Sequence, residues 1–245
     1  MPLRIGFDMD GVLADFAAAY HDVEVRLFGP VAPTRVGDPE DEAVEAASAG
    51  TDEAGSPEQP AREESAREAK KQARELRRRH DVVWQAIRAT PDFWMTLPPT
   101  EPFAVQRIHE MMLRHPWEVF FITQRPVTAG ETVQRQTQRW LVQQGFDLPS
   151  VLVIRGSRGA AAGALKLDYH VDDSPTNCVD VKSESCAKPI LIVPDGDETT
   201  VASARKLGIG SARTITECLD ILEQATTARA QPTLLGRIAS LVGWS

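Results

Sequence analysis

The segment from Arg4 to Phe16 (RIGFDMDGVLADF) constrains the fold of this chain more than any other feature, because an apolar run ends there in two closely spaced carboxylates. Side chains two residues apart on a strand point the same way, so Asp8 and Asp10 converge on one small volume unless the chain bends. Gly11 permits a bend, since glycine adopts backbone conformations that are closed to other residues. Two carboxylates this close repel each other unless a cation lies between them. The motif therefore implies a divalent metal ion.

Two further apolar runs end in polar residues that could join this motif, which on its own also occurs in turns and in calcium-binding loops. The first run ends at Thr123 and is followed by Gln124, and the second ends at Asp172 and Asp173. Ligands of an open parallel sheet bind beyond the carboxyl ends of the strands, where residues distant in sequence meet. The alternation of such strands with helical periodicities predicts an α/β fold with a doubly wound, mostly parallel sheet.

This order of motifs resembles the haloacid dehalogenase (HAD) superfamily of phosphohydrolases, and the sequence DMDGVLADF is most similar to its 5'(3')-deoxyribonucleotidase group. The resemblance extends from the N-terminus to about Asn177 and is interrupted by an insert. It implies that Asp8 is a nucleophile and that Asp10 is the general acid and base. It also implies that Thr123 binds a phosphate oxygen, and we expect the adjacent Gln124 to contact the substrate.

The chemistry of these residue types agrees with the implied roles. A carboxylate that attacks phosphorus forms an aspartyl-phosphate and divides a difficult hydrolysis into two easier displacements. A second carboxylic acid can protonate the departing alkoxide and later deprotonate water, a task typically worth about 10²–10⁴-fold in rate. The resemblance further implies Mg²⁺, held by Asp8, the main-chain carbonyl of Asp10, and one or both of Asp172 and Asp173. Magnesium prefers octahedral coordination by oxygen atoms, which these groups supply.

The superfamily also places a cation, usually lysine, near the phosphate, and here the sequence departs from that pattern. Residues 157–165 predict a short alanine-rich helix that leads into the strand ending at Asp172. Lys166 then lies at the far end of that strand, roughly 15–20 Å from the carboxyl end at about 3.3 Å per residue. Arg158 lies at the start of the helix, on the side of the motifs. Of these two candidates we expect Arg158 to bind phosphate.

The chain is expected to consist of a catalytic core with an insertion after the first strand. Residues 1–15 and 98–225 are assigned to the core, and residues 16–97 to a helical cap of the kind that closes over substrates in this superfamily. Within the cap, residues 36–64 are acidic and almost lack large apolar side chains, which predicts disorder. Residues 226–245 form an amphipathic tail whose apolar stripe either docks on the core or contacts a partner or a membrane surface.

Aromatic residues are scarce, so those near the first motif and in the predicted cap are candidates for substrate contact. Phe16 follows the motif directly and Trp84 lies in the cap. Stacking on a nucleotide base contributes roughly 1–3 kcal/mol per base, and for Phe16 packing is an equally good explanation. For Phe93 and Trp94 we expect hydrophobic packing and not substrate contact. His170, within the strand that ends in the second acid pair, is expected to be a buried core residue.

Charge and cysteine content restrict the partners of the chain. The formal net charge of -8 disfavours general affinity for nucleic acid polymers, whose binding depends on cationic contacts, and favours a small phosphate substrate. The three cysteines are an odd number without metal-ligand spacing, and the sequence shows neither a signal peptide nor a membrane span. These features predict a cytoplasmic protein, and they leave its oligomeric state open.

Three functions remain open from the sequence. The first is a magnesium-dependent phosphate monoester hydrolase, a 5'-nucleotidase acting on (deoxy)nucleoside monophosphates. The second keeps this chemistry but acts on a sugar phosphate or another small metabolite, because the cap selects the substrate. The third is a non-catalytic, phosphate-binding regulatory protein. The presence of both Asp8 and Asp10 disfavours the third, since binding alone requires no proton-transferring acid.

Overall fold

The computed structural model describes residues 2–30, 59–193 and 197–230 of the 245-residue chain. The chain forms two compact units: unit 1 consists of Met1–Phe16 and Pro91–Ser245, and unit 2 of Ala17–Thr90. Within the described residues, all strands belong to unit 1.

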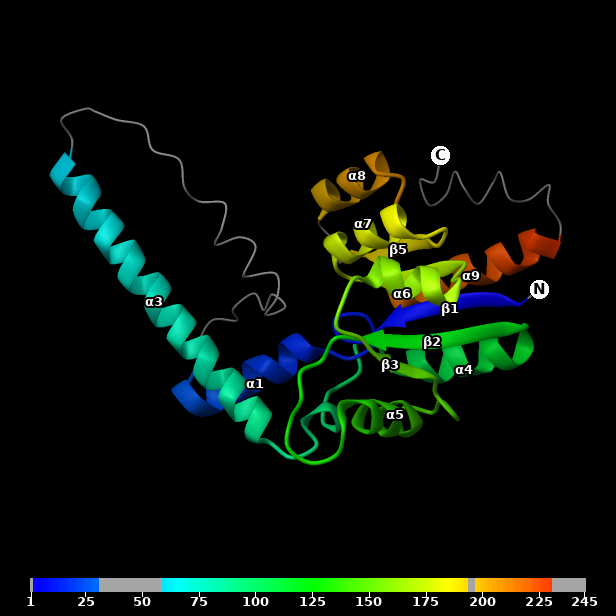
Figure 1. Ribbon diagram of the computed structural model, residues 1–245, viewed down its shortest axis with the longest axis horizontal. Coiled ribbons are helices and arrows are strands. Elements are labelled where there is room, and N and C mark those ends of the chain that lie inside the picture. The colour runs from blue at the N-terminus through cyan, green and yellow to red at the C-terminus, as the bar shows by residue number, and fades with distance from the viewer. Residues whose placement is uncertain (1, 31–58, 194–196, 231–245) are drawn as a thin grey trace. The chain divides into compact units, whose positions relative to one another are not determined.

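Unit 1 is built around a six-stranded sheet in which each pair of neighbouring strands is parallel. The strand order β3-β2-β1-β4-β5-β6 places β1 in the middle of the sheet, between β2 and β4 (Figure 1). Residues on both faces of β1 are largely buried, as expected for a parallel sheet covered by helices, and Leu3, Ile5 and Phe7 form its apolar face. This architecture confirms the predicted doubly wound α/β fold. The strands are β1 (Leu3–Asp8), β2 (Trp117–Thr123), β3 (Val151–Val153), β4 (Tyr169–Asp172), β5 (Lys188–Ile192) and β6 (Gly210–Ala212).

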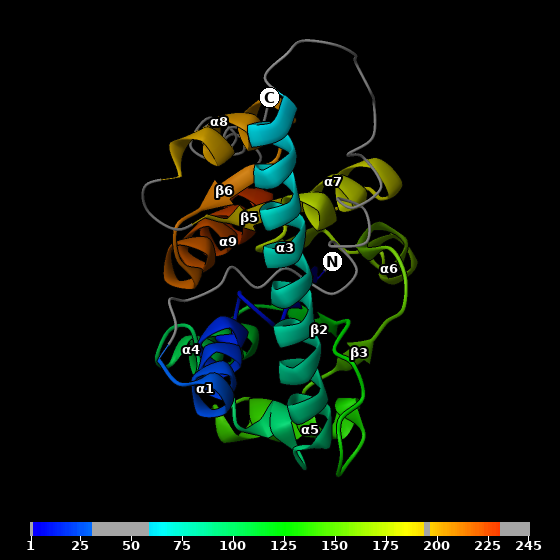
Figure 2. The same ribbon diagram turned by 90° about the vertical axis from the view of Figure 1, so that its left-hand side faces the viewer.

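Helices cover both faces of this sheet. The pair α6 and α7 packs on one face, and the pair α4 and α9 packs on the other (Figure 2). Helix α5 lies beside β3 and contacts a short 3-10 turn, η1, while α8 lies beside β6. The helices of unit 1 are α4 (Ala104–Arg114), α5 (Val133–Gln143), α6 (Arg158–Leu165), α7 (Pro175–Glu184), α8 (Glu198–Lys206) and α9 (Ile215–Ala230), and η1 spans Phe93–Met95.

Local sequence explains why α6 begins beside the carboxyl ends of the strands. The Ser157 hydroxyl accepts hydrogen bonds from the backbone N–H groups of Gly159 and Ala160, at 3.0 and 3.3 Å, and so caps the helix. The helix ends at Lys166, whose φ of 50° lies in the left-handed region and turns the chain towards β4. The predicted helix over residues 157–165 is confirmed, and Arg158 becomes its first residue.

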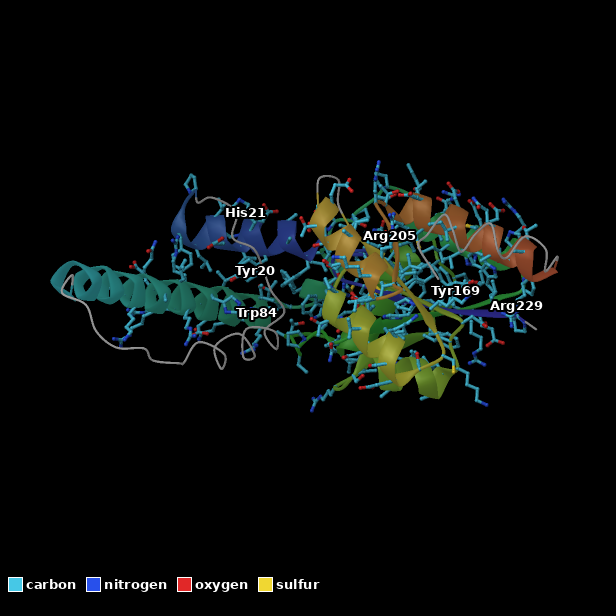
Figure 3. All side chains as sticks on the ribbon, turned by 90° about the horizontal axis from the view of Figure 1, so that it is seen from above. Tyr20, His21, Trp84, Tyr169, Arg205 and Arg229 are labelled. Carbon is cyan, nitrogen blue, oxygen red and sulfur yellow. The ribbon has the colours of Figure 1, made fainter. Side chains whose placement is uncertain are left out.

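Unit 2 pairs helix α1 (Phe16–Phe28), whose first residue belongs to unit 1, with the long helix α3 (Gln59–Ala89). Tyr20 and Trp84 face one another across this pair, with ring centroids 6.2 Å apart (Figure 3). Val83 and Ile87, four residues apart near the end of α3, are fully buried and lie on one face of the helix.

The acidic segment predicted over residues 36–64 is only partly described. Its first part falls within residues 31–58, which lie outside the described residues. Residues 59–64, however, belong to α3, so the prediction of disorder was wrong for them. Alanine, glutamate and arginine are good helix formers, and they allow α3 to begin before its first large apolar residue.

Two other predicted boundaries differ from the structure. Residues 91–97, assigned from sequence to the cap, belong to unit 1. Residues 226–230, assigned to the tail, continue α9, because the Thr226 hydroxyl accepts a hydrogen bond of 2.8 Å from Trp117 Nε1 and holds the helix on the core. The apolar stripe predicted beyond residue 230 lies outside the described residues. Among the described helices, none combines the length and the apolar character required to span a membrane.

Candidate active site

Three neighbouring strands end in the side chains that the sequence predicted to meet. Asp8 is the last residue of β1, Thr123 of β2 and Asp172 of β4, and both β2 and β4 are hydrogen-bonded to β1. All three residues are buried. Because parallel strands end at the same edge of a sheet, two acids and a hydroxyl gather at one place.

The turn after β1 brings the second acid pair against the first. Gly11 has a φ of 80°, a conformation that strains other residues, and the Leu13 and Ala14 N–H groups both bond to the Met9 carbonyl oxygen. A Cβ atom at Gly11 would overlap the carboxylate of Asp173. The glycine is therefore required twice, for the backbone conformation of the turn and for the close approach of Asp173.

The structure places Arg158, and not Lys166, at this edge of the sheet. The Arg158 side chain is 3 % exposed, its Nη2 atom donates a hydrogen bond to Asp8 Oδ1, and its Nε atom lies 3.5 Å from Asp172 Oδ2. Lys166 is exposed at the opposite end of α6. A planar guanidinium that already contacts a carboxylate also has the geometry to bind phosphate oxygens.

Asp172 is held in place by protein donors. Its Oδ1 atom accepts hydrogen bonds from the Ser174 N–H at 2.9 Å and from Asn177 Nδ2 at 3.1 Å, and its Oδ2 atom lies 3.0 Å from His170 Nε2. Burial alone would raise the pKa of Asp172, but the bonds from His170, the Arg158 charge and the Ser174 N–H together hold it below its usual value. His170 is buried as expected, and its bond to Asp172 was not predicted.

Asp8 has the opposite electrostatic balance. Burial raises the pKa of Asp8 well above its usual value of 3.8, and although Arg158 opposes this shift, the charges of Asp172, Asp173 and Asp10 add to it. An ionised Asp8, as a nucleophile must be, is therefore costly in the protein alone. A nearby cation would relieve this cost.

The residues present fit a divalent cation of this kind. Within the described residues, no group of three or more carboxylate, imidazole or thiol side chains is arranged to hold a metal ion alone. The implied Mg²⁺ set needs fewer side chains, because a main-chain carbonyl and water supply the remaining oxygen ligands. Asp8 and Asp173 are the carboxylates that suit this role. Asp172 suits it less, since protein donors already engage both of its oxygen atoms.

Arg125 is the residue of the site that the sequence analysis missed. Its side chain is fully buried and forms an ion pair with Asp10, with Nη2 2.6 Å from Oδ1 and Nε 2.8 Å from Oδ2. Its position in the sequence could have indicated a role in the site, because it lies two residues beyond the strand that ends in the Thr123 hydroxyl. Gln124, expected at the substrate, instead donates a hydrogen bond of 3.1 Å to the Gly156 carbonyl oxygen and links two loops at the edge of the sheet.

The two aromatic candidates for substrate contact have different surroundings. Phe16 is half-buried and lies 5.6 Å from Trp94 and 6.5 Å from Phe93, measured between ring centroids. Phe93 and Trp94 are buried in unit 1, as predicted for core residues. Trp84 is buried too, and its indole N–H donates a hydrogen bond of 2.9 Å to His80 Nε2. Its surroundings favour packing over stacking on a substrate.

The parallel sheet and its helices have the fold of HAD-family hydrolases. A HAD-family hydrolase from Deinococcus radiodurans R1, solved with bound phosphate and sodium, is 15% identical with a TM-score of 0.52, over 94% of this chain and 96% of that chain. A haloacid dehalogenase-like family protein from Streptococcus pneumoniae is 12% identical with a TM-score of 0.51, over 90% and 98%. A hydrolase from Pseudomonas syringae is 14% identical with a TM-score of 0.50, over 91% and 98%.

No protein-family model and no curated protein matches the sequence. Likeness at these identities establishes the fold and not the reaction. The predicted resemblance is therefore confirmed for the HAD fold, and the 5'(3')-deoxyribonucleotidase group stays a prediction.

Proposed function

We propose that the protein is a magnesium-dependent phosphate monoester hydrolase that forms an aspartyl-phosphate on Asp8. The observation that carries this proposal is that the acids after β1, the hydroxyl after β2 and the acids after β4 lie at one edge of the sheet, with the Arg158 guanidinium bonded to Asp8. These residues are Asp8, Asp10, Thr123, Asp172 and Asp173. Its support is chemical, because a nucleophile, a proton-transferring acid, a phosphate-binding cation and ligands for a metal ion are all present.

In this reaction an Asp8 oxygen forms a bond to phosphorus while the bond from phosphorus to the ester oxygen breaks. Protonated Asp10 gives its proton to the departing oxygen, which leaves as an alcohol. Asp10 then removes a proton from water, whose oxygen attacks phosphorus and restores the Asp8 carboxylate. Arg158 and the Thr123 hydroxyl would bind the oxygens of the transferring phosphoryl group.

Asp8, Asp173 and the Asp10 carbonyl would hold Mg²⁺. When bound, the ion neutralises negative charge at Asp8 and on the phosphoryl group. The raised pKa of Asp8 supports this assignment, since burial and the neighbouring carboxylates outweigh the Arg158 charge that favours the ionised nucleophile.

The surroundings of the two aromatic candidates bear on the choice of substrate. The half-buried ring of Phe16 beside the first motif suits a nucleotide base, which supports (deoxy)nucleoside monophosphates as substrates. The packing of Trp84 against Tyr20 and His80 removes the second aromatic candidate and favours a sugar phosphate or another small metabolite. The three cysteines are free, which supports the cytoplasmic location expected from the sequence.

A panel of phosphate monoesters, assayed for phosphate release in Mg²⁺ and in EDTA, tests the proposal. We expect magnesium-dependent turnover by the wild-type protein and none by Asp8→Asn. Asp147→Asn, which changes an exposed acid of unit 1, is the matched control and should keep full activity. Turnover of nucleotides or of sugar phosphates would distinguish the two substrate classes. Turnover by Asp8→Asn at the rate of the wild type would contradict the proposal, and so would a wild-type protein that hydrolyses none of the esters.

A further inference from the structure

Arg125 follows β2 and extends its side chain into the interior of unit 1. All three of its guanidinium nitrogens have partners: Nε and Nη2 bond to Asp10, and Nη1 donates to Thr137 Oγ1 at 3.1 Å. The guanidinium carbon lies 4.9 Å from the ring centroid of Trp94. The side chain is thus held by α5 and η1, while its charge faces the acid that follows β1.

The contact with Asp10 is a two-pronged one. Nε lies 2.8 Å from Oδ2 and Nη2 lies 2.6 Å from Oδ1, so the planar guanidinium meets both carboxylate oxygens. Such paired bonds fix the orientation of a carboxylate as well as its position. The Asp10 side chain remains 23 % exposed, whereas that of Arg125 is 0 % exposed. Arg125 therefore holds Asp10 from the buried side and leaves its outer edge accessible.

Asp10 needs this support because it lies beyond the end of β1. The strand stops at Asp8, and Asp10 belongs to the turn that Gly11 closes, where its backbone forms only an isolated bridge with Ala14 and is not part of the sheet. A general acid must lie within hydrogen-bond reach of the oxygen that it protonates. A single ammonium group would supply a point contact and not a planar one.

We propose that Arg125 is a positioning residue that orients Asp10 for proton transfer to the leaving group. This inference rests on the proposed phosphatase function. It predicts a dependence on the substrate that loss of folding alone would not produce. An alkyl phosphate must receive a proton as its alkoxide departs, whereas 4-nitrophenyl phosphate releases a stable phenolate without one.

Single-turnover measurements with enzyme in excess test this inference, because they follow release of the leaving group and not the later attack of water. The substrates are 4-nitrophenyl phosphate and the best alkyl monoester from the panel, both in Mg²⁺. We expect Arg125→Met to slow release from the alkyl ester by roughly 100-fold, the lower end of the usual range for general acid catalysis, and release of nitrophenolate by less than about 10-fold. Arg125→Lys should fall between Arg125→Met and the wild type.

The control is Arg139→Met, which removes an arginine of α5 that is 55 % exposed and paired with Glu131. It should change neither rate. Thr137→Val serves if Arg125→Met fails to fold, because it keeps the side-chain shape and removes only the acceptor of Nη1. It should show the same preference for the aryl ester to a smaller degree.

Three results would overturn the inference. Equal losses on both esters, in Arg125→Met or in Thr137→Val, would give Arg125 a purely structural role and leave the proposed function intact. A folded Arg125→Met protein that releases the alcohol from the alkyl ester at the wild-type rate would exclude the positioning role. A wild-type protein that hydrolyses neither ester would remove the proposed function and this inference together.

Discussion

Replacing Arg158 by methionine should destabilise the protein strongly when magnesium is absent. The side chain is 3 % exposed and contacts two buried carboxylates, those of Asp8 and Asp172. Removing one partner of a buried ion pair typically costs about 3–5 kcal/mol, because the charge that remains is buried without compensation. The free energy of unfolding of a domain is about 5–15 kcal/mol, so Arg158→Met should still fold.

Urea unfolding in EDTA, followed by tryptophan fluorescence, measures this loss. A loss of about 4 kcal/mol shifts the midpoint by roughly 2 M at an m-value of about 2 kcal/mol/M. Lys166→Met is the matched control, since Lys166 is the other candidate cation and is exposed. It should change the free energy of unfolding by no more than about 0.5 kcal/mol.

Magnesium should reduce the difference between wild type and Arg158→Met, because the ion supplies positive charge to Asp8, one of the two carboxylates that Arg158 contacts. A ligand at 100 times its Kd adds about 2.7 kcal/mol to the free energy of unfolding. The reasoning would be refuted by a loss below about 1 kcal/mol in EDTA, given the usual cost of breaking a buried pair. A larger effect of Lys166→Met would refute it equally.

Two further predictions concern Asp8 and Gly11. The folded-state pKa of Asp8 is raised above its usual 3.8, so its contribution to stability is fully present below pH 3.8 and is lost as the pH rises through the folded-state pKa. In EDTA, the free energy of unfolding of the wild type relative to that of Asp8→Asn should therefore fall as the pH rises over this range. Parallel pH profiles of the two proteins would contradict this prediction. Gly11→Ala should lower the free energy of unfolding by about 1–2 kcal/mol because of the φ of 80°, and should weaken Mg²⁺ binding, measured by calorimetry, because the new methyl group displaces Asp173. Gly29→Ala is the control: its φ is 82° and nothing lies near its Cβ position, so it should show only the loss of stability. Equal Mg²⁺ affinities in the two variants would exclude the clash with Asp173.

Much of the fold and part of the candidate site could be predicted from local sequence. Apolar runs that end in Asp8, Thr123 and Asp172 identify the carboxyl ends of three strands, and a parallel sheet brings such ends together. Ser157 is a good helix-capping residue, and its position determines which end of α6 carries Arg158. Each of these inferences depends on residues close to one another in the chain.

The remaining features depend on contacts between distant residues, which one sequence does not reveal. Arg125 and Asp10 are separated by 115 positions, and nothing near either residue identifies its partner. The end of α9 depends in the same way on the bond from Trp117 to Thr226. Trp84 packs against Tyr20, which lies far from it in the chain, so its position in the predicted cap did not show that it is a packing residue.

The central claim is that Asp8 becomes phosphorylated during turnover, and mass spectrometry of the acid-quenched protein tests it most directly. Asp10→Asn is the suitable variant with 4-nitrophenyl phosphate, because the first step needs no acid with this ester while the attack of water lacks its base. We predict one phosphoryl group on the peptide that contains Asp8, with fragmentation placing it on that residue, and no adduct when Asp8 is also replaced by asparagine. A phosphoryl group on another residue, or its persistence without Asp8, would contradict the account.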